Sequence, residues 1–318
     1  MFLSRRKLLN YINYTGIAAI STPIFGAMNT DGNTHHLDYF KFTIGNIKIT
    51  VVSDGGFHLP ISSIDINSTE ESLKKHLRKY HMPDDHIYMN TNLAVIEVGE
   101  NKLIIDVGSG SRFIGSTGKL FDNLSKANID PDSITHVFLT HAHPDHILGI
   151  RDDFDETIFP DAKFMISEKE FNWWTKKDRV NEVEETFIQM VLWAQNSLNA
   201  IPEISLFTNE KSILPGITAF DTSGHSPGHS SILVESEGSK LIIGGDVIRN
   251  TYTSLKNSDF IPDTDMDPVK AKKTRHEILD LLTKEKIAYL GYHFPFPGVG
   301  HIIAHEKSYE FIPASIRW

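Results

Sequence analysis

The stretch "THAHPDH", residues 140–146, places His141, His143, Asp145 and His146 within six residues. Imidazole and carboxylate groups are the side chains that bind divalent metals, and four of them this close do not easily all pack as core. The stretch contains no Lys or Arg, so it does not resemble a usual solvated surface run either. We therefore interpret it as the centre of a metal site.

The local backbone explains how one loop can supply two sets of ligands. His141 and His143 follow a short apolar strand, and in extended backbone residues i and i+2 point the same way. Pro144 then turns the chain into a predicted helix, so that Asp145 and His146 face a neighbouring position. Two adjacent ligand sets suit a dinuclear centre, whose ions lie roughly 3.5–4 Å apart.

Two metal sites need more ligands than one loop supplies, and the chain has no cysteine, so every donor must be nitrogen or oxygen. The remaining candidates share one property, which is that each lies in a loop after an apolar strand. They are His225 and His229 in "SGHSPGHSSILVE" (223–235), Asp246 in "LIIGGDV" (241–247), and His293 and His301 in "AYLGYHFPFPGVGH" (288–301).

Short β-like runs alternate with amphipathic helical runs after about residue 38. The strand "KLIID" (102–106) recurs as "KLIIGGD" (240–246), and each copy ends in an aspartate. Two similar β-rich halves with helices outside predict an α/β fold, a four-layer α/β/β/α sandwich. We expect hairpins over 42–55 and 92–108, and helices over 118–129, 185–200 and 267–286.

Composition narrows the function of the chain. Its 318 residues can bury a sizeable core, and 40 % hydrophobic with 23 % charged residues is the mix of a soluble globular protein. The formal net charge of −10 argues against nucleic-acid binding, which usually requires a basic face. We expect a small-molecule substrate, no nucleic-acid partner and no stable membrane anchor, with a homodimer left open.

The N-terminus carries a different signal. "SRRKLL" at 4–9 precedes a mildly apolar stretch at 16–27, and this layout resembles a twin-arginine export signal. The apolar stretch is too short and too interrupted to span a membrane. We predict that residues 1–36 are an export signal or a disordered segment and that 37–318 form one domain. The protein would then be periplasmic or secreted; a basic tail on a cytoplasmic protein is the alternative.

With these motifs in place, the sequence resembles the metallo-β-lactamase superfamily. That family carries H-x-H-x-D-H, a later Gly-His-x-Pro-Gly-His, a strand ending in Gly-Asp and a final His, and all four occur here in order. The segments "GNIKITVVSDGGFHLP" (45–60), "FPGVGH" (296–301) and "YEFIP" (309–313) resemble the methyl parathion hydrolase branch, whose relatives include acyl-homoserine lactonases.

The resemblance implies two divalent metal ions, with zinc as the default for a His-rich site. It implies a metallo-β-lactamase-like hydrolase domain over 37–318, with seven residues that bind the metals. One ion would be bound by His141, His143 and His229, and the other by Asp145, His146 and His293, with Asp246 bridging the two.

Other residues near these motifs receive different interpretations. His225 resembles the family's structural histidine, His301 is interpreted as structural, and Asp106 as a turn-capping carboxylate. The substrate pocket of the parathion-hydrolase branch is aromatic, and Trp174 in "EFNWWTKK" (170–177) falls at a matching position. Phe113 is a similar substrate-binding candidate, while core packing is the alternative for Trp174.

This ligand set predicts a hydrolase that attacks an ester, lactone or phosphotriester with a metal-bridging hydroxide, with Asp145 and Asp246 as catalytic carboxylates. The acidic charge and the aromatic run favour a small, neutral, partly apolar substrate. Two alternatives are kept. One is an oxidoreductase of the same fold, similar to a persulfide dioxygenase, although a complete second site argues against its single iron. The other is a metal-binding protein without catalysis.

Overall fold

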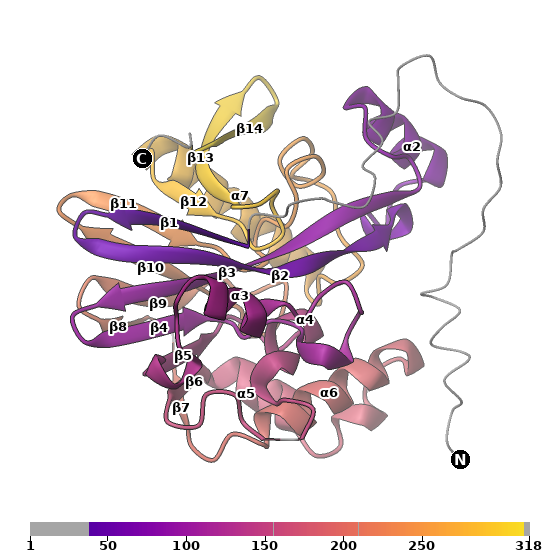
Figure 1. Ribbon diagram of the computed structural model, residues 1–318. Coiled ribbons are helices and arrows are strands. Elements are labelled where there is room, and N and C mark those ends of the chain that lie inside the picture. Colours follow the sequence, from indigo (N-terminus) through magenta and orange to yellow (C-terminus); the bar gives the residue numbers. More distant parts are fainter. Residues whose placement is uncertain (1–37, 155, 209, 315–318) are drawn as a thin grey trace. The chain divides into compact units, whose positions relative to one another are not determined.

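The computed structural model describes residues 38–154, 156–208 and 210–314, and the predicted export segment lies outside them. The described chain forms two seven-stranded sheets (Figure 1). The first contains Tyr39–Ile44 (β1), Ile47–Pro60 (β2), His86–Val98 (β3), Asn101–Ile105 (β4), His136–Leu139 (β5), Lys163–Ser167 (β6) and Ile204–Phe207 (β7). The second contains Lys211–Leu214 (β8), Ile217–Asp221 (β9), Ser230–Ser236 (β10), Ser239–Ile243 (β11), Ala288–Leu290 (β12), Val299–His305 (β13) and Ser308–Pro313 (β14).

The helices include each of those predicted from periodicity. The longest begins at Pro268, and Asp267 caps it by accepting a hydrogen bond from the Lys270 N–H at 3.0 Å. Within the described ranges, no helix combines the length and the apolar character needed to cross a bilayer. The α-helices are Glu70–Lys79 (α2), Leu120–Lys126 (α3), Pro144–Ile147 (α4), Glu168–Thr175 (α5), Ile188–Leu198 (α6) and Pro268–Glu285 (α7).

Three apolar clusters separate the layers. The inner faces of both sheets meet in a central core, to which Val51 and Phe138 contribute from one sheet and Ile232 and Leu241 from the other. A second cluster packs α3, α5 and α6 against the first sheet, and a third packs α7 against β11 and β12. Because each sheet buries one face against the other and one against helices, the predicted four-layer α/β/β/α sandwich is confirmed.

The internal repeat explains where the candidate ligands gather. In the first sheet β4 pairs with β5 in parallel, and in the second sheet β11 pairs with β12 in parallel. Strand β9 runs in the direction of β11, since both are antiparallel to β10. Asp106 follows β4 and Asp246 follows β11. The loops after these parallel strands therefore leave each sheet at a common end, as the sequence repeat had indicated.

Candidate metal centre

The first ligand loop is built by a strand end and a one-turn helix. His141 and His143 follow β5, and His143 is the N-cap of α4 with extended backbone angles (φ −74°, ψ 155°). Pro144 occupies the first helical position, which needs no N–H donor. Asp145 and His146 therefore project from the first turn of α4, in a direction different from that of the two preceding histidines.

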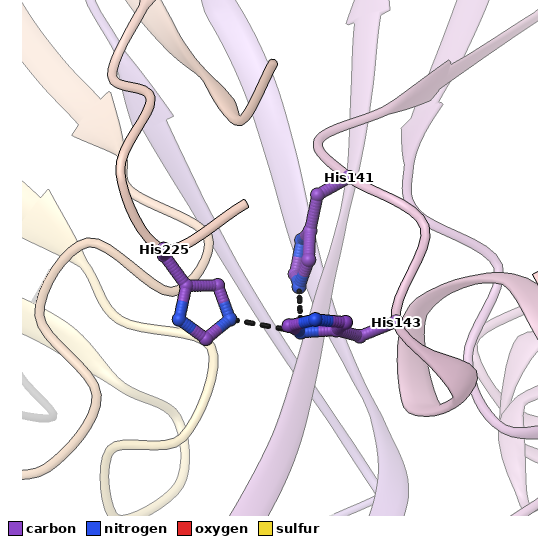
Figure 2. Close-up of side chains that lie close together, drawn as sticks. All are labelled: His141, His143 and His225. Carbon is purple, nitrogen blue, oxygen red and sulfur yellow. Dashed lines mark hydrogen bonds between the residues drawn. The ribbon is translucent and has the colours of Figure 1, made fainter. Parts of the chain in front are cut away.

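Three imidazole rings from two loops point toward one another (Figure 2). Nε2 of His141 lies 3.0 Å from Nδ1 of His143, and Nε2 of His225 lies 2.9 Å from that same Nδ1. A ring nitrogen has one in-plane lone pair or one N–H, so it cannot bond well to both neighbours at once. Three nitrogens aimed at one point are better explained as the ligands of one ion.

A second group adjoins the first. It comprises Asp145, His146 and His293, whose candidate ligand atoms lie within 4.8 Å of one another. Asp246 lies between the groups: its Oδ2 is 3.4 Å from Nε2 of His225 and 3.2 Å from Nε2 of His293. Its Oδ1 is 3.3 Å from Nε2 of His146. One carboxylate thus faces both groups, as a bridging ligand would.

Unsatisfied buried atoms show that these residues fit divalent ions. Nε2 of His146 and Oδ1 of Asp246 are buried, and neither has a hydrogen-bond partner among the described residues. Buried polar atoms are normally paired, so two orphans that face each other call for a ligand between them. Imidazole nitrogen and carboxylate oxygen are the donors that zinc and other divalent first-row metals accept.

The electrostatics of the two groups also suit cations. Burial and the neighbouring imidazoles lower the pKa of His141 and His143 well below the ordinary value, so both rings are neutral and can donate a lone pair. Burial opposes the charged form of His146 as well, but the carboxylates of Asp145, Asp106 and Asp246 raise its pKa well above the ordinary value. That excess of negative charge is what a metal ion would neutralise in place of the proton.

The ligand rings are held from behind. In three candidate ligands the ring nitrogen opposite the ligand atom contacts an oxygen, a pairing that fixes the tautomer and orientation of metal-binding histidines. The pairs are His146 Nδ1 with Asp106 Oδ2 at 2.7 Å, His225 Nδ1 with Asp265 Oδ1 at 2.9 Å, and His293 Nδ1 with the Asn90 carbonyl at 2.7 Å.

The carboxylates of Asp106 and Asp265 have roles that the sequence analysis did not predict. Asp106 does cap the turn, by accepting from the Thr140 N–H at 2.7 Å, but it also orients His146. Asp265 was not singled out from the sequence. It lies in a loop before α7, 40 residues after the histidine that it contacts, and no local pattern marks it.

His225, which the resemblance marks as structural, lies in the first ligand group, whereas His229, which it marks as a ligand, contacts groups of the protein. Nδ1 of His229 lies 2.8 Å from the Thr222 hydroxyl, and Nε2 accepts the backbone N–H of Asp246 at 3.0 Å. Both ring nitrogens are therefore occupied by the protein, and burial lowers the pKa of His229 to about 3. Gly245 permits this contact, because a Cβ there would lie 2.6 Å from His229 Nε2. Both rings lie beside His141, with centroids 4.9 Å and 5.0 Å away, but only His225 brings a ligand atom into the group of His141 and His143.

A buried glutamate that the sequence did not single out joins the two histidine loops. Glu170 has no exposed surface. Its Oε1 accepts from the Ala142 N–H at 3.0 Å and from the Trp174 indole at 2.7 Å. Its Oε2 accepts from the Ser226 hydroxyl at 2.8 Å and the Gly228 N–H at 2.6 Å. Glu170 thus fixes the loop of His141 to the loop of His225, although it lies on α5, outside every motif.

The two aromatic candidates occupy different environments. Trp174 is fully buried, its indole N–H is bonded to Glu170, and its ring lies edge-on to His143 with centroids 5.7 Å apart. It therefore packs behind His143, in the position that the core alternative described, and its role toward a substrate stays a prediction. Phe113 is partly exposed and packs edge-on against Phe57, which in turn contacts His293.

A cavity beside α3 is separate from the metal centre. It has a volume of about 430 Å³ and is lined by residues that include Leu120, Phe121 and Phe159 beside α3. None of the candidate ligands lines it.

His301, interpreted as structural, lies on β13, opposite Ala288 in the sheet, and is not part of either ligand group.

Comparison with known proteins agrees with the fold. The Metallo-beta-lactamase superfamily profile matches residues 88–292. The N-acyl homoserine lactonase AiiA of Bacillus thuringiensis subsp. kurstaki is 22 % identical over 241 residues, which cover 70 % of this chain and 85 % of that protein. The solved structure of AidC, described as a dizinc quorum-quenching lactonase, is 27 % identical with a TM-score of 0.81, covering 87 % and 97 % of the two chains. The hydrolase AbOPH, 23 % identical, has the same fold with a TM-score of 0.81, covering 88 % and 99 %.

Proposed function

Because the chain belongs to the metallo-beta-lactamase superfamily, we propose that it is a dinuclear metal-dependent hydrolase that opens a lactone or cleaves a related ester. The observation that supports this most is the position of Asp246, whose carboxylate faces His225 of one ligand group and His293 of the other. A shared carboxylate between two adjacent ligand groups is the arrangement that a two-metal hydrolase requires.

The proposed ligand set differs from the expected one at a single position. Two ions, zinc by default, would be bound by His141, His143 and His225 on one side, and by Asp145, His146 and His293 on the other, with Asp246 shared. When bound, such ions lower the pKa of a water molecule and polarise the carbonyl or phosphoryl oxygen under attack.

The protein's own part is to orient the donors and to exclude water from them. His141 and His146 have no exposed surface, and the Asp106 and Asp265 carboxylates keep the rings of His146 and His225 in fixed tautomers. The Asp145 side chain is the most exposed of the ligand carboxylates, at 10 %. Substrate would therefore reach the centre from the Asp145 side.

The lactone is preferred among candidate substrates because two of the similar proteins above are described as lactonases. Aryl esters and phosphotriesters have the same need for an activated water and a polarised oxygen, so they belong in the same assay. The phosphotriester is a candidate substrate because the segments at 45–60 and 296–301 resemble the parathion-hydrolase branch.

The test combines metal analysis with a hydrolysis panel. Purified protein should contain two equivalents of a divalent metal and hydrolyse at least one of an acyl lactone, an aryl ester and a phosphotriester. Asp246→Asn should lose metal and at least about a hundredfold in rate, the effect of losing one ion's transition-state stabilisation. Asp259→Asn, which changes an exposed carboxylate paired with Lys272 of α7, is the matched control. A protein that binds two metals and hydrolyses nothing in the panel would contradict the proposal.

A further inference from the structure

Arg249 is a largely buried cation whose Nε has no hydrogen-bond partner among the described residues. It follows Asp246 by three residues in the loop after β11 and is 7 % exposed. Its Nε lies 3.4 Å from Oδ2 of Asp246, without the geometry of a hydrogen bond. Within the described ranges, the guanidinium makes no other ion pair. A buried charge in this condition costs free energy unless another group compensates it.

The other buried arginine nearby shows what a compensated guanidinium looks like. Arg275 donates to the carbonyls of Val247, Ser258 and Phe260, and its Nη2 donates to Asp265 at 2.7 Å. Asp265 contacts Arg275 and His225 directly, so it attracts Arg249 only at longer range, without a hydrogen bond or a close ion pair. Arg275 therefore has a full set of hydrogen-bond partners, and Arg249 has no comparable set among the described residues.

Asp246 is an insufficient partner for Arg249 once the centre is loaded. Its two oxygens already face His146, His225 and His293. Two divalent ions would bring four positive charges against the two negative charges of Asp145 and Asp246, while Asp106 and Asp265 lie behind the ligand rings and Asp265 is already paired with Arg275. A third cation at this distance is then repelled by its surroundings, and an incoming anion would relieve that repulsion.

Arg249 and Asp145 keep more exposed surface than the histidines around them. Their side chains are 8 % and 10 % exposed, whereas His141 and His146 are completely buried. A substrate that approaches the ligand groups from this side would therefore meet the guanidinium beside the reacting centre. Five N–H donors in a planar fork match the two oxygens of a carboxylate.

We propose that Arg249 is a specificity residue that binds an anionic group of the substrate, and that the preferred substrate is an ester or lactone with a carboxylate near the scissile carbonyl. The proposal rests on the hydrolase function proposed above. It changes the expectation of a neutral substrate, because the net charge of −10 describes the whole chain, whereas a metal-loaded centre together with Arg249 would attract an anion locally.

A matched pair of substrates tests the role of Arg249. Phenyl butyrate and monophenyl succinate present the same aryl ester on chains of equal length, and a carboxylate in the second replaces the terminal methyl group of the first. In Arg249→Met, and after subtraction of the uncatalysed rate, kcat/KM for monophenyl succinate should fall about tenfold to a hundredfold more than kcat/KM for phenyl butyrate, the size expected for a lost charge-assisted pair. Arg249→Lys should lose less, because the charge remains without the fork. Arg78→Met, which removes an exposed arginine paired with Asp84, should leave kcat/KM for both esters unchanged.

A binding measurement separates this proposal from the hydrolase proposal. Succinate should bind the metal-loaded wild-type protein in calorimetry, and Arg249→Met should weaken that binding at least tenfold while metal content stays the same. Equal losses on both esters, unchanged succinate affinity or loss of metal in Arg249→Met would each overturn the proposal. If the wild type hydrolyses neither ester, the hydrolase proposal is contradicted. The effect of Arg249→Met on succinate binding then tests the role of Arg249 by itself. If Arg249→Met does not fold, Arg249→Lys must show the intermediate loss.

Discussion

Replacing Glu170 by glutamine should uncouple the two histidine loops with little change in shape. The carboxylate accepts four hydrogen bonds, two at each oxygen. An amide nitrogen must replace one of those oxygens, and the less costly choice is Oε2, because the Ser226 hydroxyl can rotate to accept from it. The Gly228 N–H then faces another donor and is left without a partner.

The structure sets the size of the effect. Loss of a hydrogen bond to a charged group costs about 1.5–3 kcal/mol, and an unpaired buried donor costs about 1–3 kcal/mol. Because these terms overlap at Gly228, we expect Glu170→Gln to destabilise the protein by about 2–4 kcal/mol, or roughly 5–10 °C in melting temperature. Burial raises the pKa of Glu170, so the comparison belongs at pH 8, where ionisation is favoured.

The same substitution should also weaken metal binding. Ala142 lies between two candidate ligands, and Gly228 lies between His225 and His229, so a shift of either loop moves ligand atoms. Loss of a group that orients ligands typically lowers metal affinity tenfold to a hundredfold. Zinc release to a competing chelator measures this, alongside thermal melting followed by circular dichroism.

Asp54→Asn is the matched control, since Asp54 is also a buried carboxylate that accepts backbone N–H groups, from Ser109 and Leu120, but neither donor lies in a ligand loop. It should lower stability without a comparable loss of metal affinity. An unchanged melting temperature in Glu170→Gln would refute the hydrogen-bond reasoning. Lower stability with wild-type metal affinity would refute the coupling between the loops.

Three further predictions follow from other contacts. His225→Ala should lower metal affinity more than His229→Ala when both are titrated against a chelator, because only His225 faces His143; the opposite order would restore the assignment implied by the family motif. Burial raises the pKa of Asp54 from 3.8 to about 6, so the folded state gains this proton first. Relative to Asp54→Asn, the wild type should therefore gain up to about 3 kcal/mol as pH falls from 7 to 4, and a constant difference in urea denaturation across that range would disprove it. Trp174→Phe should lower stability by about 1–3 kcal/mol through an unpaired Glu170 oxygen and lost volume, and a raised KM without any change in melting temperature would instead support a pocket role.

Much of the metal centre could be predicted from the sequence, because several of its ligands lie close together along the chain. In "THAHPDH", an extended segment followed by proline and a helical turn fixes the directions of His141, His143, Asp145 and His146 within six residues. The repeat of "KLIID" and "KLIIGGD" likewise placed Asp106 and Asp246 at equivalent strand ends, since the carboxyl ends of parallel strands meet at one edge.

The sequence by itself therefore determined the fold class, the superfamily and the residue types of the metal centre, because periodicity and ligand spacing express short-range geometry. Only the tertiary structure decided between His225 and His229, since each ring's role depends on partners at Asp246 and Asp265, far along the chain. The same holds for Glu170 and Arg249: a carboxylate that joins two loops and a guanidinium that lacks a partner are defined by what packs around them, and packing brings together residues that no local pattern connects.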